Sequence, residues 1–187
     1  MGTTGWIVIG IVVVVVLFAI MLYNGLVAGR NQVEAAWRQI DVQLKRRRDL
    51  VPNLVEAVKG YMAHERETLD AVIRARNAAV GAADGPREGQ IQAEAALSGS
   101  LGRLFALSEA YPDLKANQNV LQLQEELSST ENKIAFSRQH YNDSVMAQNT
   151  RVESFPAMLV AGSMGFAKHP YFEVDEQDRA VPQVKLR

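Results

Sequence analysis

The sequence predicts an all-α protein: a single N-terminal transmembrane helix followed by a bundle of long antiparallel helices with short connections. Two observations support this fold class. Residues 6–23, WIVIGIVVVVVLFAIMLY, contain no charged side chain. After them, apolar residues recur every three or four positions, the spacing of one helix face, and no alternating strand pattern of any length appears. We therefore expect a short tail at residues 1–5, the bundle at residues 24–154, and a tail at residues 155–187 that is first apolar and then acidic.

The apolar segment at residues 6–23 has the length of a membrane span. At ~1.5 Å per residue its helix would be ~27 Å long, close to the ~30 Å hydrocarbon core of a bilayer. Trp6 and Tyr23 stand at its two ends, as interfacial aromatic residues do. The alternative is a cleaved signal peptide, which is disfavoured because residues 1–5 carry no Lys or Arg and no small-residue cleavage site follows.

The distribution of cations predicts the orientation of the span. The residues before it carry no Lys or Arg, whereas basic residues follow it and culminate in a run of four: Lys45, Arg46, Arg47 and Arg48. The positive-inside rule then places the N-terminus outside and the C-terminal domain in the cytoplasm. The same four residues are candidates for contact with anionic headgroups. A solvated helix face or a turn explains the run equally well.

Three or four helical segments are expected after the span, depending on Pro52. Residues 24–80 form either one helix or two with approximate bounds 24–48 and 50–80, and two further helices follow at 87–110 and 113–154. The sequence VGAADGPREG at residues 80–89 breaks the apolar repeat, and Pro86 suits a first helical turn. Pro112 opens the last helix and Pro156 ends it.

Pro52 allows two interpretations. It either lies in the first turn of a new helix after a tight reversal, or it kinks one helix of about 55 residues. The apolar stripe keeps its phase through the proline, which favours the kink. The basic run and Asp49 near a cap position favour the turn. The residues by themselves leave both open.

The segment at residues 155–172, FPAMLVAGSMGFAKHPYF, is apolar and aromatic and lies outside the helical repeat. One interpretation places it in the bilayer interface. The aromatic anchors would then be Phe155, Phe166, Tyr171 and Phe172. A docking surface for a partner protein is a second interpretation. The third is that the segment folds back over one end of the bundle, as apolar tails commonly do.

No constellation of residues indicates catalysis, a cofactor or a metal. There is no cysteine. His64 and Glu65 begin a zinc-protease motif, but Thr68 stands where the second histidine is required. Neither His64 nor His140 has the glutamate three residues earlier that a di-iron bundle needs, and His169 has no ligand company. With 20 Lys and Arg against 21 Asp and Glu, the charge balance gives no indication of a nucleic-acid partner.

Four stretches of the sequence resemble the LemA family of bacterial membrane-anchored proteins. They are YNGLVAGRNQVEAAWRQIDVQLKRRRDLVPNLVEAVKGYMAHE (23–65), YPDLKANQNVLQLQEELSSTENKIAFSRQHYN (111–142), FPAMLVAGSMGF (155–166) and PYFE (170–173). The resemblance implies a long, antiparallel, up-and-down four-helix bundle behind one N-terminal span of the bacterial inner membrane, and hence a turn at Pro52. It supplies no catalytic residue. Relatives that occur beside membrane proteases, or among magnetosome-membrane proteins, imply another membrane protein as a partner.

We expect a non-enzymatic, membrane-anchored helical scaffold or adaptor that assembles with itself or with other membrane proteins at the cytoplasmic face. Tethering confines copies to two dimensions and so favours homo-oligomers. The expected partners are membrane lipids, further copies of the chain, and a membrane protease or other membrane protein. The alternative is a membrane-shaping or lipid-interacting protein that uses the basic run and residues 155–172. Amide side chains at the start of the last helix suit hydrogen bonding between helices, within the chain or between copies: Asn117, Gln118, Asn119, Gln122 and Gln124.

Overall fold

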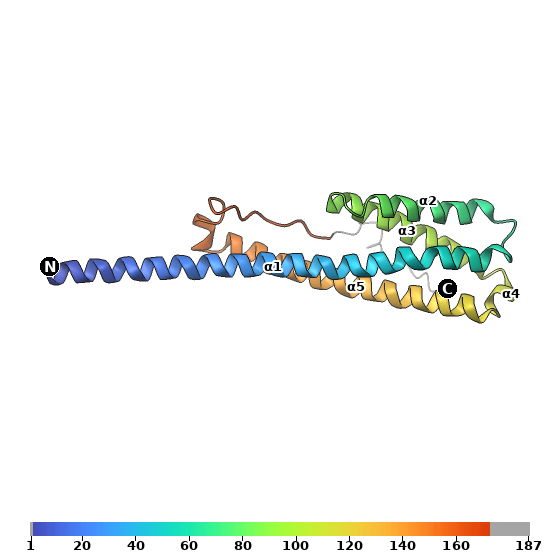
Figure 1. Cartoon of the computed structure of the whole chain (residues 1–187), viewed down its shortest axis with the longest axis horizontal. Helices are drawn as coiled ribbons and strands as arrows, with labels where there is room; N and C mark the ends of the chain where they lie inside the picture. The colour runs from blue at the N-terminus through green and yellow to red at the C-terminus, as the bar shows by residue number, and fades with distance from the viewer. Residues whose placement is uncertain (1, 173–187) are drawn as a thin grey trace, which may run out of the picture. The chain divides into compact units, whose positions relative to one another are not determined.

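The structure is a computed structural model that describes residues 2–172. Within this range the chain is helical and contains no strand (Figure 1). It divides into two compact units. The first comprises Met1–Ala36 and Gln139–Arg187, of which residues 2–36 and 139–172 are described. The second comprises Trp37–Arg138.

Helix α1, Thr3–Lys59, begins with the predicted apolar segment. Its apolar window has a mean hydropathy of 3.1, and none of that window is buried within the structure. Among the described residues it is the only helix long and apolar enough to cross a membrane. A run of exposed apolar side chains without a charge has no stable place in water, so α1 is compatible with a membrane anchor.

α1 continues without interruption through Pro52, and the predicted turn there is wrong. Proline has no N–H, so the carbonyl oxygen of Arg48, four residues earlier, lacks its helical donor. The side chain of Arg76 replaces that donor, with its Nε donating to the Arg48 oxygen at 3.2 Å. The missing helical bond is thus compensated by a residue of the next helix. The interpretation as one helix, which the phase of the apolar stripe favoured, is the correct one.

The break expected near residue 49 lies instead at residues 60–65, so the predicted bounds 24–48 and 50–80 are also wrong. Gly60, a poor helix former, follows the last residue of α1, and the chain turns with Tyr61 and Met62 both donating to the Val58 carbonyl. α2, Arg66–Gly81, follows. Met62 is fully buried and holds the turn against the core.

α3, Arg87–Ser108, lies within two residues of its expected bounds, and Pro86 precedes its first residue as the N-cap. The expected helix at 113–154 is divided in two. A single turn, α4 (Pro112–Lys115), is followed by α5 (Gln118–Glu153). Asn117 causes the separation, because its Oδ1 accepts hydrogen bonds from the backbone N–H groups of Asn119 and Val120 at 3.0 and 3.3 Å. This is the capping geometry that starts a new helix.

The core of the second unit combines side chains from every helix that enters it. α1 contributes Val51, Leu54, Val55 and Val58, and Met62 follows from the turn. The remaining core residues come from α2 to α5: Leu69, Val72, Ala79, Leu97, Leu101, Leu104, Leu114, Val120 and Leu127. The apolar stripes predicted from spacing are therefore the buried faces of these helices.

The first unit has a smaller core, formed where the chain returns to α1 after α5. Leu26 of α1 packs with Ala157, Ala161 and Phe166. Gly29 lets α5 approach α1 closely, because a Cβ at this position would lie 2.9 Å from Cδ of Gln148. The Gln148 side chain fills that space and its Nε2 donates to the carbonyl of Leu26 at 3.2 Å.

Candidate functional site

The most distinctive site of the first unit lies on α1 at the end of the apolar segment. We call it the Tyr23 cluster: Tyr23, Leu26 and Arg30 of α1 with Ala157, Ala161 and Phe166 of the returning chain. The Phe166 ring is buried and meets the Tyr23 ring edge to face, at a centroid distance of 5.8 Å and an interplanar angle of 71°. The Arg30 guanidinium carbon lies 5.4 Å from the centroid of the same ring, within cation–π range.

Two asparagines of α5 hold the segment that follows Phe166. The backbone N–H of His169 donates to Asn149 Oδ1 at 2.9 Å, and Asn149 Nδ2 donates to the His169 carbonyl at 3.0 Å. Asn142 makes the same pair of bonds with Phe172, at 2.8 and 3.2 Å. Between them, the Tyr141 hydroxyl donates to the Pro170 carbonyl at 3.0 Å. We call the two asparagine pairs the amide clamps; they fix residues 169–172 along α5.

The structure separates the four aromatic residues predicted as interfacial anchors. Phe166 and Phe172 are buried, so neither is available to a bilayer. Phe155 is 78% exposed and Tyr171 is 43% exposed. The segment therefore does fold back onto its own unit, but not with all of its apolar side chains. Trp6, at the start of the apolar segment, is 67% exposed.

Sequence reasoning did not find the amide clamps. It directed attention to amide side chains at the start of the last helix. There Asn117 caps α5, and Gln124 Nε2 lies 3.5 Å from Ser108 Oγ, a contact between helices of one chain. A signal for the clamps was present, because Asn142 and Asn149 are seven residues apart and therefore share one face of a helix.

The predicted basic run divides into an exposed and a buried half. Lys45 and Arg46 are exposed, and Arg46 lies 3.9 Å from Glu126. Arg47 and Arg48 are 2% and 5% exposed. The prediction that all four contact lipid headgroups therefore fails for Arg47 and Arg48. Helix geometry argues against that prediction, because four consecutive residues lie ~100° apart around a helix and cannot all face one side.

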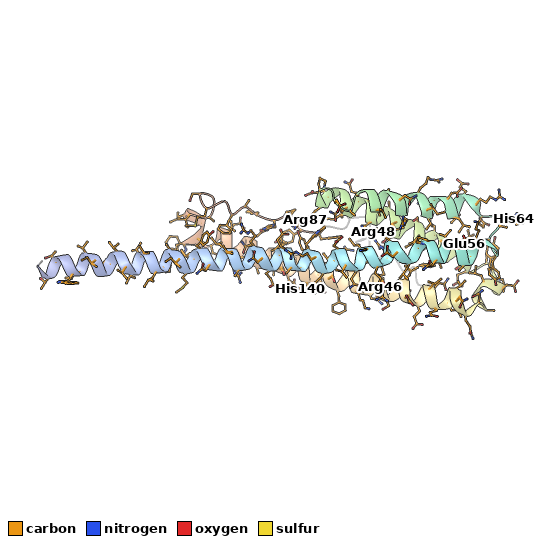
Figure 2. The ribbon with its side chains drawn as sticks, in the orientation of Figure 1. Arg46, Arg48, Glu56, His64, Arg87 and His140 are labelled. Carbon is orange, nitrogen blue, oxygen red and sulfur yellow. The ribbon has the colours of Figure 1, made fainter. Side chains whose placement is uncertain are left out.

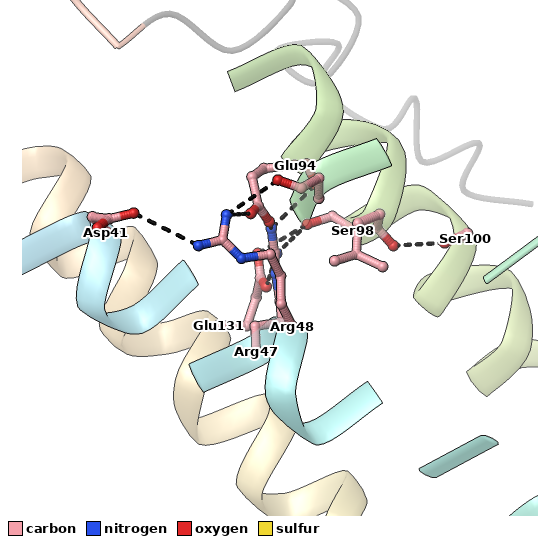
Figure 3. A network of polar contacts seen from close by, with 9 residues as sticks. Asp41, Arg47, Arg48, Glu94, Ser98, Ser100 and Glu131 are labelled. Carbon is pink, nitrogen blue, oxygen red and sulfur yellow. Dashed lines mark hydrogen bonds and ion pairs between the residues drawn. The ribbon is translucent and has the colours of Figure 1, made fainter. Parts of the chain in front are cut away.

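The two buried arginines share one buried carboxylate, that of Glu94 (Figure 3). Arg47 Nη2 donates to Glu94 Oε2 at 2.5 Å, and Arg48 Nη1 donates to Glu94 Oε1 at 3.0 Å. Arg47 Nη1 also donates to Ser98 Oγ at 2.5 Å and to Glu131 Oε2 at 2.6 Å. Arg48 Nη2 lies 3.7 Å from Asp41.

This network joins α1 to α3 and α5 through charge rather than through apolar packing. Charges removed from water are tolerated only when they are paired and hydrogen-bonded. Glu94 meets that condition for both guanidinium groups at once. The arrangement is that of a structural ion network, because the Nη atoms of both arginines contact protein groups, while the buried Arg47 Nε has no hydrogen-bond partner among residues 2–172.

A shallow groove of about 760 Å³ runs between α1 and α5 in the second unit. Most of the residues that line it carry amide or hydroxyl side chains. The apolar residues Val42 and Phe136 also line it. These two are 62% and 80% exposed. The Oε1 atom of Gln43 in the same groove is buried and has no hydrogen-bond partner among the described residues.

The histidines are not brought together. His64 is exposed in the turn after α1, and His140 is exposed on α5, where its Nε2 lies 3.5 Å from Gln32 Nε2 (Figure 2). His169 engages Asn149 through its backbone. Over residues 2–172, no three His, Asp or Glu side chains are grouped so that they could hold a metal ion.

Over residues 2–172 the fold defines a class of protein: it is all-helical, with one N-terminal helix long and apolar enough to cross a membrane. The chain belongs to the LemA family, whose sequence profile matches residues 36–186. It is 26% identical to Protein LemA of Metamycoplasma hominis over 156 residues, which cover 83% of this chain and 71% of that protein.

Two further relatives are named as magnetosome proteins. The chain is 24% identical to Magnetosome protein MamQ of Magnetospirillum gryphiswaldense over 177 residues. It is also 24% identical to Magnetosome protein MamQ 2 of Paramagnetospirillum magneticum over 178 residues. Each match covers 82% of this chain but 65% of the relative, so the chain spans about two thirds of their length.

Proposed function

We propose that this protein is a membrane-anchored, non-enzymatic helical scaffold or adaptor at the cytoplasmic face of the bacterial inner membrane. The observation that carries the proposal is the composition of α1. Its first part is an exposed apolar segment of membrane length, and its last part supplies Val51, Leu54 and Val58 to a helical core. One helix thus serves both as the anchor and as part of the folded unit.

The proposed form of the second unit is an up-and-down four-helix bundle made by α1 from residue 37, α2, α3 and α5. Support comes from the short connections at residues 60–65, 82–86 and 109–117, since short connections join antiparallel neighbours. The shared core, to which all four helices contribute, also supports it. A long bundle presents extended side surfaces, which suits a protein that binds others rather than one that encloses a substrate.

Family membership supports the association with a membrane. Two relatives carry the name magnetosome protein, and the match to each covers 82% of this chain. The proposal for this chain has three parts: anchoring by residues 6–23, a cytoplasmic helical domain, and assembly with further copies or with another membrane protein.

The orientation can be tested with single cysteines, because the sequence contains none. Thr4 and Ser129 are both exposed. In intact cells, a membrane-impermeant maleimide should label a Thr4→Cys variant and should label a Ser129→Cys variant only after permeabilisation. Labelling of Ser129→Cys in intact cells would overturn the cytoplasmic placement.

Assembly is tested separately, on the full-length chain extracted in a mild detergent. Light scattering should give a protein mass above that of one chain, or a second membrane protein should co-purify in a fixed ratio. A protein that is strictly monomeric and without companions would contradict the scaffold proposal while leaving the anchor untouched.

The alternative function, direct action on lipids, retains two of its four basic residues. Lys45 and Arg46 remain exposed, and their replacement by glutamine should weaken binding to anionic vesicles if they contact headgroups. An unchanged affinity would exclude these residues from lipid contact. The exposed part of the returning chain is the stronger support for a lipid contact.

A further inference from the structure

We propose that residues 155–159 form an interfacial foot, which inserts Phe155, Met158 and Leu159 into the bilayer surface beside the point where α1 leaves it. The inference rests on the proposed anchoring by α1 and adds a second point of contact with lipid. These three side chains are 78%, 56% and 68% exposed. Ala157, between them, and Ala161 and Phe166, further along the returning chain, are buried instead.

Neighbouring residues of the foot face opposite ways, one toward the protein and the next two outward. The helical turn Ala157–Leu159 directs Ala157 inward, where it is 7% exposed, while the two residues after it face outward. Ala161 returns to the interior and packs with Leu26 of α1. An alternation of small buried and large exposed apolar residues is unexpected for a segment that faces water on its outer side. It is expected for one that packs on protein with one face and on lipid with the other.

The position of the foot along α1 agrees with the interface. The inward residues contact α1 at Leu22, Leu26 and Val27. Tyr23, the last aromatic residue of the apolar segment, lies on the same stretch of helix, and Leu26 is three residues further, which corresponds to ~5 Å along the axis. That distance is comparable to the ~5–10 Å depth to which interfacial segments are buried at the headgroup boundary.

Part of the backbone of the foot is paired within the chain. Met158 and Leu159 donate to the carbonyls of Ser154 and Pro156, and the Ala157 carbonyl accepts from Val160 and Ala161. Backbone groups that are paired within the segment do not need water as a partner, which is the condition for residence near hydrocarbon. The Asn149 clamp and the Phe166 ring then fix the segment on its unit.

The bilayer is the occupant that the neighbouring residues favour. The exposed apolar surface of α1 at Ile20, Met21 and Tyr23 leads directly to the level of the foot. Arg30, which is exposed beside the Phe166 ring, carries a cation at the level expected for lipid phosphates. Apolar side chains next to a membrane span and a cation one turn beyond match the arrangement of interfacial anchors.

The test places an environment-sensitive fluorophore on single cysteines of the full-length chain in phosphatidylcholine–phosphatidylglycerol vesicles. Leu159→Cys reports on the foot and Val13→Cys on the anchor. Met146→Cys is the matched control, since Met146 is an exposed apolar residue of the same unit, 55% exposed on α5. All three positions are exposed, so labelling does not disturb a core.

The proposal expects the label at residue 159 to be quenched by lipids that carry a nitroxide near the headgroup, and to be several-fold less accessible to aqueous iodide than the label at 146. Equal iodide access at 159 and 146, with residue 13 still quenched by mid-chain nitroxides, would overturn the foot and leave the anchor standing. Shielding from iodide without quenching by lipid would overturn it in favour of a protein contact. Iodide access at residue 13 as well would overturn both.

Discussion

Asn149 and the backbone of His169 exchange two hydrogen bonds, with the His169 N–H donating at 2.9 Å and the Asn149 amide donating back at 3.0 Å. Only an amide side chain can donate and accept in this geometry at once. Asn142 repeats the arrangement with Phe172. The order of residues 169–172 therefore depends on the two amide clamps.

Replacing Asn149 with alanine should loosen this segment without unfolding the chain. Two hydrogen bonds are lost, each worth ~1 kcal/mol, so the amide proton of His169 should exchange with solvent ten-fold or more faster. Hydrogen exchange read by mass spectrometry measures the effect. Asn132→Ala, at an exposed position of the same helix, is the control and should leave it unchanged. Equal protection at residue 169 in both variants would contradict the clamp.

Arg76 and Pro52 should be coupled in stability. Arg76→Ala removes the donor to the Arg48 carbonyl and should cost ~1–3 kcal/mol, the cost of leaving a buried polar group unpaired. Pro52→Ala restores the helical N–H that can serve the same oxygen. In that background Arg76→Ala should cost ~1 kcal/mol less, as urea unfolding of the four chains of a double-mutant cycle would show. If Arg76→Ala lowers the free energy of unfolding equally with Pro52 and with Pro52→Ala, the Arg76 side chain does not compensate for the proline.

The course of α1 shows what the sequence could and could not determine. The phase of the apolar residues through Pro52 correctly indicated one helix, and the buried faces of α2, α3 and α5 followed from spacing. The family resemblance then favoured a turn, because it implies a bundle of four helices and a break at Pro52 would supply the fourth. The deciding interaction, from Arg76 to the Arg48 carbonyl, joins residues 28 apart, and local patterns carry no information on such a contact.

Glu94 should be the most sensitive polar residue of the second unit. Glu94→Gln leaves two buried guanidinium groups without their shared anion and should cost ~3–5 kcal/mol in the free energy of unfolding. Glu131→Gln is the matched control. Its side chain also contacts Arg47 but is 50% exposed, and its loss should cost ~1 kcal/mol or less. Chemical denaturation followed by circular dichroism compares them, and equal costs would contradict the central role of Glu94.

Tyr111 should ionise at higher pH than a free tyrosine. Its hydroxyl donates to Glu65 Oε1 at 3.0 Å, and this hydrogen bond, with desolvation and the negative charge of Glu65, raises the pKa of Tyr111 above 10.0. The pKa of Tyr111 is higher in the folded than in the unfolded protein. The hydrogen bond therefore stabilises the fold fully below the unfolded-state pKa of Tyr111, and this stabilisation is lost as the pH rises through the folded-state pKa. Glu65→Gln should lower the pKa, read from phenolate absorbance. A pKa that does not change would show that the hydrogen bond has no such effect.

The candidate site was less accessible to sequence reasoning than the fold. Residues 155–172 were correctly singled out as apolar and apart from the helical repeat. Which of the aromatic residues face outward depends on the amide clamps and on the close approach at Gly29, where Gln148 occupies the space of a side chain. Likewise, the burial of Arg47 depends on Glu94, which lies 47 residues away. Long-range pairings of this kind become visible only in the folded chain.

The central claim is that residues 6–23 remain in the chain and hold it in the membrane. Alkaline carbonate extraction of bacterial membranes, combined with N-terminal sequencing of the retained protein, tests it most directly. We predict that the protein stays with the membrane pellet and that its sequence begins before Trp6. Release into the carbonate supernatant, or a mature N-terminus beyond Tyr23, would contradict the account.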